Sequence, residues 1–127
     1  LPLVCANPDL ARFAPEGLIE AAGVLAQRYE ALGGAVFYHG KPYPPIYRSC
    51  LAALGCTPDK VLAIGDSVEH DVLGASRVGI CSALIPGGVH APKLGIAWGQ
   101  LPDPQRWQAF AANAPALPQY LLSAFNW

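Results

Sequence analysis

The stretch Val61-Leu62-Ala63-Ile64-Gly65-Asp66-Ser67-Val68-Glu69-His70-Asp71 decides the fold of this chain. It begins as a short apolar run, which is typical of a buried parallel strand because other layers cover both faces of such a strand. Asp66 follows at the end of the strand, and Asp71 lies where the next helix should begin. Ligands bind at the carboxyl ends of strands in open α/β sheets, so the two acids are candidate ligands of a hard cation such as Mg²⁺. On these residues alone, the pattern is explained equally well if Asp66 is a turn residue and Asp71 is a favourable charge at the start of a helix.

Length and composition bound the class of protein. The chain has 127 residues, of which 53% are hydrophobic, so it can form one domain with a buried core. Its net charge of -1, with only 8 Lys and Arg, argues against a basic surface for nucleic acid. No apolar run reaches the length of a membrane span, and the first residues show no basic region followed by an apolar stretch. We therefore expect a soluble cytoplasmic protein that binds neither nucleic acid nor a membrane.

The cysteines and the first residue carry two further expectations. Cys5, Cys50, Cys56 and Cys81 form no C-x-x-C pair that would indicate zinc or redox chemistry. We expect buried, reduced thiols. The chain begins with Leu1 and contains no Met, so we expect it to be a piece of a longer protein.

The segments around the acidic stretch alternate between strand and helix patterns. Apolar runs and helical spacing predict strands at 1–6, 35–38, 61–64 and 80–85 and helices at 17–32, 46–54, 72–78 and 104–112. The strand–helix–strand order from 61 to 85 is a βαβ unit, so we predict an α/β fold with a Rossmann-like parallel sheet. The apolar tail at 118–127 is expected to pack on the body.

Two further short motifs lie upstream of the acidic stretch. Lys41 is held on a bend between Gly40 and Pro42, so its ammonium can project into a cleft, although most lysines are merely solvated. The segment Asn7-Pro8-Asp9 ends the first strand, and on its own it is an ordinary loop. The segment around Lys41 contains prolines 42, 44 and 45, so it is the best candidate for a hinge or domain boundary.

Taken together and in this order, the three motifs, followed by Gly74-Ala75, resemble the haloacid dehalogenase (HAD) superfamily. The resemblance is to its class IIA, the p-nitrophenyl phosphatases and the nucleotide or sugar phosphate phosphatases, and it spans most of residues 3 to 90. It implies a HAD-like core with an inserted α/β cap. Residues 1–40 would be the end of the cap domain, and residues 41–127 the C-terminal half of the core.

The resemblance also implies a role for each candidate residue. Lys41 matches the positive residue that holds the phosphate and the attacking aspartate, where its charge suits an anionic transition state. Asp66 matches the direct Mg²⁺ ligand, and Asp71 matches the acid that binds the metal's water or orients its ligands. The implied ligand is a phosphorylated small molecule. The residues assigned to its binding are Asn7, Asp9 and Ser67.

Two departures from the family pattern matter. His70 stands where many relatives have threonine, and we favour a surface or helix-capping histidine over a pH-sensitive site contact. The family's chemistry begins with a D-x-D pair, which supplies the nucleophile and the general acid and base, and this chain contains no D-x-D. We therefore expect the C-terminal part of a Mg²⁺-dependent phosphomonoesterase that acts through an aspartyl-phosphate intermediate. Without its nucleophile segment it should be inactive, and it should form homo-oligomers or pair with the missing N-terminal half.

Two alternatives come from other classes of protein. A non-catalytic phosphate- and metal-binding or regulatory module with a HAD-like fold would keep the same half-site. A receiver-like signalling domain fits poorly, because its lysine should follow the acidic residues, whereas Lys41 precedes Asp66 and Asp71.

Overall fold

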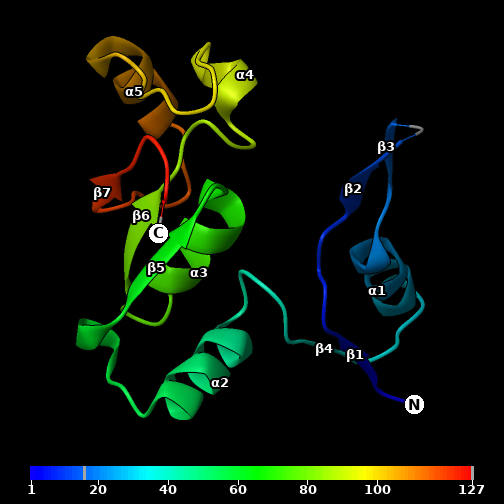
Figure 1. Ribbon diagram of the computed structural model, residues 1–127. Coiled ribbons are helices and arrows are strands. Elements are labelled where there is room, and N and C mark those ends of the chain that lie inside the picture. Colours follow the sequence, from blue (N-terminus) through cyan, green and yellow to red (C-terminus); the bar gives the residue numbers. More distant parts are fainter. Residues whose placement is uncertain (16, 127) are drawn as a thin grey trace.

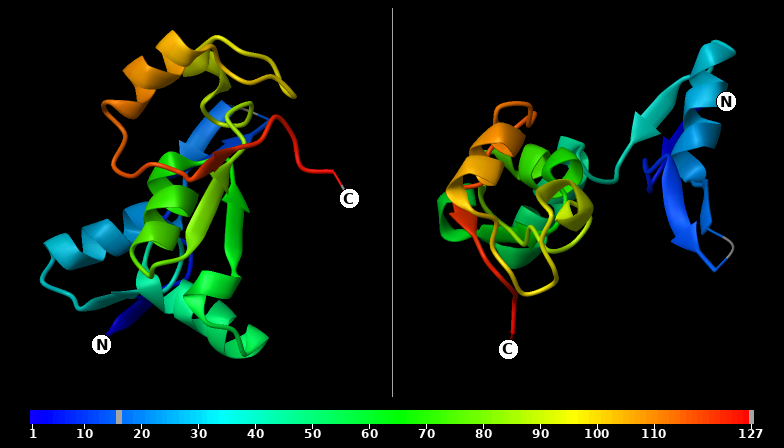
Figure 2. Two further views of the ribbon diagram at one scale, coloured as in Figure 1. Left: turned by 90° about the vertical axis from the view of Figure 1, so that its left-hand side faces the viewer. Right: turned by 90° about the horizontal axis from the view of Figure 1, so that it is seen from above.

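The computed structural model describes residues 1–15 and 17–126, which form two lobes (Figures 1 and 2). The N-terminal lobe holds β1 (Leu3–Cys5), β2 (Ala11–Ala14), β3 (Gly17–Glu20), α1 (Ala22–Ala31) and β4 (Val36–Tyr38). The C-terminal lobe holds α2 (Pro44–Leu54), β5 (Leu62–Gly65), α3 (Leu73–Ser76), β6 (Cys81–Leu84), α4 (Ala91–Leu94), α5 (Pro104–Ala111) and β7 (Tyr120–Leu121). A 3₁₀ turn, η1 (Pro58–Lys60), precedes β5, and a π-helical turn, η2 (Val68–Val72), follows it. Across the described ranges, no helix combines the length and the hydropathy needed to cross a membrane.

In the N-terminal lobe, β1 pairs with β4 in parallel, and β2 and β3 form an antiparallel hairpin. The prediction of a helix over residues 17–32 is wrong for its first turn, because Gly17–Glu20 is a strand and the helix begins only at Ala22. Gly17 has a φ of 114°, a left-handed conformation that reverses the chain and lets the next residues pair with β2. The predicted end of this helix is confirmed, since its C-cap is Leu32 and the next residue, Gly33, has a φ of 85°.

In the C-terminal lobe, three parallel strands lie in the order β5-β6-β7. The predicted βαβ unit is confirmed, with η2 and α3 as its crossover. Val68, Val72 and Leu84 are buried together, and partly buried side chains that include Trp107 and Phe110 pack against them. The tail does more than pack on the body, because Tyr120–Leu121 adds a strand to β6; the last residue of the predicted tail, Trp127, lies outside the described residues.

Two helices lie within two residues of the predicted ranges 46–54 and 104–112. Helix α2 begins at a proline and is closed by Gly55 in the left-handed region, with a φ of 61°. Helix α5 begins after Asp103, whose side chain accepts a hydrogen bond from the backbone N–H of Arg106.

The expectation of buried thiols is correct for Cys5 and wrong for the other three. Cys50, Cys56 and Cys81 are exposed, and the four cysteines are free. The apolar stripe of α2, which carries Cys50, contains no buried residue. Apolar spacing identifies a helix face, but a second layer of structure must cover that face before its residues are buried.

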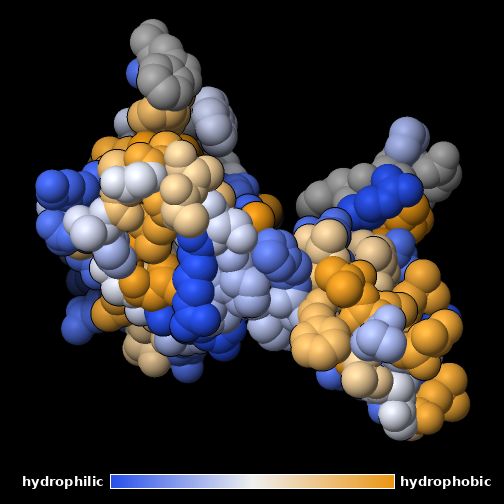
Figure 3. Space-filling model, turned by 90° about the horizontal axis from the view of Figure 1, so that it is seen from below, coloured by the Kyte–Doolittle hydropathy of each residue, from blue (hydrophilic) through white to orange (hydrophobic). Residues whose placement is uncertain are grey.

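Large apolar side chains lie open to solvent on both lobes (Figure 3). Val4 in β1 is 70% exposed, Phe37 in β4 is 63% exposed, and Leu62 in the edge strand β5 is 45% exposed. An uncovered apolar strand edge favours pairing with another chain. The 127-residue chain alone is therefore expected to self-associate. Sedimentation velocity tests this prediction, and a tight monomer with low dye-accessible apolar surface would contradict it.

Candidate active site

The acidic loop begins where β5 ends. The chain leaves the strand at Gly65, and η2 turns the side chain of Asp71 back against it. Asp71 is buried, and its Oδ2 accepts a hydrogen bond of 3.1 Å from the backbone N–H of Ser67. Because this bond links the carboxylate to its own loop, Asp71 is held at the carboxyl end of the strand.

Gly65 is needed for this close approach. A Cβ at that position would collide with the Asp71 carboxylate. We expect Gly65→Ala to displace the carboxylate and to destabilise the fold by about 1–3 kcal/mol, the usual cost of overpacking. Urea unfolding measures the change. An unchanged free energy of unfolding in Gly65→Ala would contradict the steric explanation, because Gly65 does not have a positive φ that would by itself penalise an alanine.

Lys41 reaches the acidic loop from the segment that joins the lobes. A hydrogen bond of 2.9 Å from the Tyr43 N–H to the Gly40 carbonyl closes a turn around it, and the Tyr43 ring stacks on Tyr38 at 4.6 Å. The Lys41 Nζ lies 2.7 Å from the Asp71 Oδ1. The lysine side chain is 55% exposed, so solvent screens the ion pair while the ammonium stays accessible to a ligand.

Asp66 is held from the opposite side of the loop. Its Oδ2 accepts a hydrogen bond of 3.1 Å from the backbone N–H of Val89, in the segment after β6. Gly88 packs directly on the same carboxylate, with no space for a Cβ. The ends of two neighbouring parallel strands therefore meet at this acid, as expected for the carboxyl edge of the sheet.

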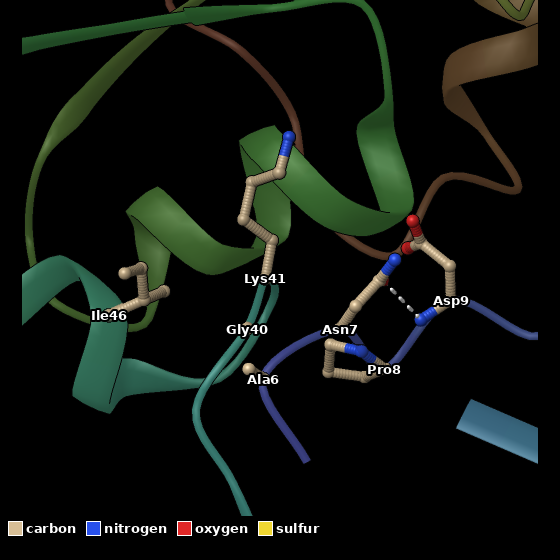
Figure 4. A pocket seen from close by; sticks show the side chains of 7 residues that line it. All are labelled: Ala6, Asn7, Pro8, Asp9, Gly40, Lys41 and Ile46. Carbon is tan, nitrogen blue, oxygen red and sulfur yellow. Dashed lines mark hydrogen bonds between the residues drawn. The ribbon is translucent and has the colours of Figure 1, made fainter. Parts of the chain in front are cut away.

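A pocket of about 250 Å³ brings most of the predicted residues together. Its walls are formed by Asp9, Ala11, Lys41, Asp66, Ser67, His70, Asp71 and Val89. The remaining predicted residue, Asn7, lies in a second pocket that also contains Asp9 and Lys41 (Figure 4). There the Asn7 Oδ1 accepts a hydrogen bond of 3.0 Å from the Asp9 N–H. Residues from both lobes thus face one polar site.

His70 is a site contact and not a capping residue. Ser67 is the N-cap of η2, and its Oγ accepts a hydrogen bond of 3.2 Å from the backbone N–H of His70. The His70 ring points into the pocket, with Nδ1 3.0 Å from the same hydroxyl and Nε2 3.6 Å from the Asp9 Oδ1. The favoured prediction of a surface or helix-capping histidine is therefore incomplete, because the imidazole lies between the two lobes.

Tyr47 supports the acidic loop and was missed by the sequence reasoning. Its hydroxyl lies 3.0 Å from the His70 carbonyl oxygen and 3.2 Å from the Asp71 carbonyl oxygen, as a shared donor. Burial raises the pKa of Tyr47 to about 12, and the Asp71 charge adds to this shift, so the hydroxyl stays protonated. The sequence pattern indicated only a place on the apolar stripe of α2.

His90 is a second missed residue. It is 4% exposed, and its Nε2 accepts a hydrogen bond of 3.0 Å from the backbone N–H of Val68. The Glu69 Oε2 lies 3.3 Å from the same nitrogen. A nitrogen that accepts from Val68 carries no proton, so the tautomer inferred from this contact has its proton on Nδ1. His90 follows Pro86-Gly87-Gly88, where the sequence signalled only the end of a strand.

The protonation of His90 gives a prediction on stability. Burial lowers the pKa of His90 below 6.5 against the opposing pull of Glu69 and Asp66, while Lys93 and His70 add to the lowering. As the pH falls, the His90 imidazole therefore gains its proton in the unfolded chain before it does so in the folded chain. The free energy of unfolding is at its full value above pH 6.5, and part of it is lost as the pH falls from 6.5 to the pKa of His90 in the folded chain. When the pH is lowered from 7.5 to 5.5, the melting temperature should fall less in His90→Gln than in the wild type. Equal falls would contradict the prediction.

The donor set of the pocket fits a hard cation. Within the described residues, no three His, Cys, Asp or Glu side chains are grouped to hold a metal by themselves. Mg²⁺ needs only one or two protein carboxylates, together with waters and phosphate oxygens. Asp71 is already engaged by Lys41 and by the Ser67 N–H, so Asp66 is the better direct ligand.

The comparison with known families settles the relationship. The model of the HAD-hydrolase-like family matches residues 38–107, which are 70 of the 127 residues. This range contains Lys41, Asp66 and Asp71. The chain belongs to the HAD-hydrolase-like family. The predicted superfamily, its α/β fold and its hydrolase class are thereby confirmed for this HAD-like chain.

Curated relatives of the HAD-like chain are phosphatases. The dihydroxyacetone phosphatase of Corynebacterium glutamicum (strain R) is 33% identical over 87 residues, which are 68% of this chain and 32% of that protein. The ribonucleotide monophosphatase NagD of Escherichia coli (strain K12) is 30% identical over 87 residues, which are 68% of this chain and 34% of that protein. The matched part of the HAD-like chain thus spans about a third of the length of these relatives.

Solved structures agree with the family. A haloacid dehalogenase-like hydrolase from Brucella suis 1330 is 37% identical and superposes with a TM-score of 0.65, over 99% of this chain and 45% of that one. The p-nitrophenyl phosphatase from Archaeoglobus fulgidus has a TM-score of 0.69 over 94% of this chain and 42% of that one. At 22% identity, the second comparison supports the fold alone.

Proposed function

We propose that the HAD-like chain is part of a Mg²⁺-dependent phosphomonoesterase that acts on a phosphorylated small molecule through an aspartyl-phosphate intermediate. The observation that carries the proposal is the 2.7 Å contact of Lys41 with Asp71 in the pocket that also contains Asp66. A cation beside two carboxylates at the end of a parallel strand suits the binding of a phosphate together with a metal ion.

Each residue would take one part in the reaction. Lys41 offsets the negative charge of the transferring phosphoryl group, and Asp71 keeps its ammonium in place. Asp66 would bind the metal, and Asp71 would orient the metal's water, as acids around a metal ligand do. Mg²⁺, when bound, would supply further positive charge at the phosphate oxygens.

The two lobes would divide the work between chemistry and substrate choice. We assign residues 1–40 to the end of a cap domain and residues 41–127 to the C-terminal half of the core. Asn7 and Asp9 from the first lobe, with Ser67 from the second, face the pockets and would contact the organic part of the substrate. Names of relatives point to small phosphorylated molecules such as dihydroxyacetone phosphate or ribonucleotides.

The attacking carboxylate would come from outside these 127 residues. Asp66 and Asp71 are engaged in the metal and lysine roles, and the sequence contains no D-x-D pair. Strand β5 lies at the edge of its sheet, with Leu62 and Ile64 exposed, so a further strand can pair there. We propose that the segment carrying the nucleophile occupies this edge.

The test is a phosphatase assay on the full-length gene product. Phosphate release from p-nitrophenyl phosphate and from small sugar or nucleotide monophosphates should require Mg²⁺ and stop when EDTA is added. An in-frame D-x-D upstream of Leu1 would favour the enzyme. Binding of Mg²⁺ and phosphate without any turnover, by a gene product that lacks a D-x-D, would instead favour the non-catalytic regulatory module.

A further inference from the structure

We propose that His90 is a positioning residue that fixes the acidic turn η2 by accepting the Val68 N–H, and that it thereby sets the place of Asp71. The inference rests on the proposed function, in which η2 carries the second acid of the site. His90 itself touches no reacting group in this assignment.

The contact is made where the backbone most needs one. Val68 opens η2, and the first N–H groups of any helical turn lack partners within the turn. Val68 is fully buried, so water cannot take the place of an acceptor. The His90 Nε2, at 3.0 Å, satisfies this donor from the loop after β6. If the acceptor is lost, η2 must shift to satisfy its first N–H.

The imidazole is itself held in place. The Phe110 ring meets it edge-on, with centroids 4.9 Å apart, and the Trp107 ring contacts Phe110 in turn, with centroids 5.7 Å apart. Both aromatic residues come from α5, which therefore acts as a support for the histidine. The ring cannot turn away from Val68 without disturbing this packing.

The segment that carries His90 holds the acidic loop at a second point. The N–H of the preceding residue, Val89, donates to the Asp66 carboxylate. One short segment after β6 thus contacts both the start of η2 and the proposed metal ligand. A change at His90 should be felt at Asp71 through η2 and at Asp66 through Val89.

Three variants of the full-length gene product separate positioning from packing. His90→Phe keeps an aromatic ring against Phe110 but removes the acceptor. His90→Gln returns an acceptor at a similar distance along the side chain. His39→Phe makes the same chemical change at an exposed histidine of the N-terminal lobe and serves as the matched control.

Two readouts are compared among these proteins. Amide hydrogen exchange reports the Val68 N–H relative to the Leu84 N–H in the buried core, and calorimetry reports Mg²⁺ affinity. In His90→Phe we expect the ratio of the Val68 exchange rate to the Leu84 exchange rate to rise about tenfold or more. We also expect Mg²⁺ affinity to fall about 10–100-fold, as when other supports of a metal ligand are removed. His90→Gln should recover most of both values, and His39→Phe should change neither.

Other results would overturn the inference. Unchanged Val68 exchange in His90→Phe would show that the contact does not hold η2. Equal acceleration at Val68 and Leu84 would show global destabilisation in place of positioning. The exchange measurement stands even if Asp66→Asn leaves the phosphatase activity intact, a result that would overturn the proposed function and not the role of His90 in the loop.

Discussion

Asp66→Asn in the full-length gene product is expected to lower Mg²⁺-dependent phosphate release by about a hundredfold or more. Asparagine keeps the shape of the side chain and a carbonyl oxygen that can still accept the Val89 N–H. It lacks the negative charge that draws a divalent cation to the pocket. Losing one electrostatic contact to a transition state typically costs about 10²–10³ in kcat.

Initial rates measured over a range of Mg²⁺ concentrations check this result. The matched control is Asp59→Asn, which makes the same change at an exposed aspartate in the 3₁₀ turn before β5. The control should retain the wild-type rate and the wild-type Mg²⁺ dependence. Full activity in Asp66→Asn would rule out the metal role, and an equal loss in both variants would point to a general effect of charge.

Lys41→Gln is expected to reduce kcat about 10²–10³-fold, with a smaller effect on KM. The substitution removes the charge that would face the transferring phosphoryl group, and it leaves Asp71 without its 2.7 Å partner. Both consequences act in the transition state more than in substrate binding, because negative charge at the phosphoryl oxygens must be offset as the bond to the leaving group breaks.

Steady-state kinetics of Lys41→Gln and Lys60→Gln separate a local effect from a general one. Lys60 is an exposed lysine at the end of the 3₁₀ turn, so its neutralisation should leave both constants unchanged. A rise in KM at constant kcat in Lys41→Gln would mean that the lysine only binds substrate, and the proposed transition-state role would be wrong.

The parts of the fold that depend on local signals could be predicted from the sequence. The strand that ends at Gly65, the helix that Gly55 closes and the helix that Asp103 caps are each marked by residues inside or beside the element. The two-residue strand Tyr120–Leu121 could not be predicted, since it exists only through pairing with β6. Gly17–Glu20 was misassigned because the apolar spacing of α1 runs into it, and pairing with β2 overrides that pattern.

The same division explains the candidate site. Lys41, Asp66 and Asp71 could be proposed because charged residues at a bend and at a strand end are recognisable locally. Tyr47 and His90 could not, since their importance lies in hydrogen bonds to the backbone of residues more than 20 positions away. The chain offered no local reason to connect a histidine after Gly88 with a turn that begins at Val68.

Lys41 lies on the segment that joins the two lobes (Figure 2), and this position has a mechanical consequence. A rotation that opened the lobes would move this segment and lengthen the 2.7 Å contact between the Lys41 Nζ and the Asp71 Oδ1. A substrate large enough to hold the lobes apart would thereby move the ammonium away from the phosphoryl group, and its turnover would be slow. The position of one lysine would then make the reaction rate depend on the size of the substrate.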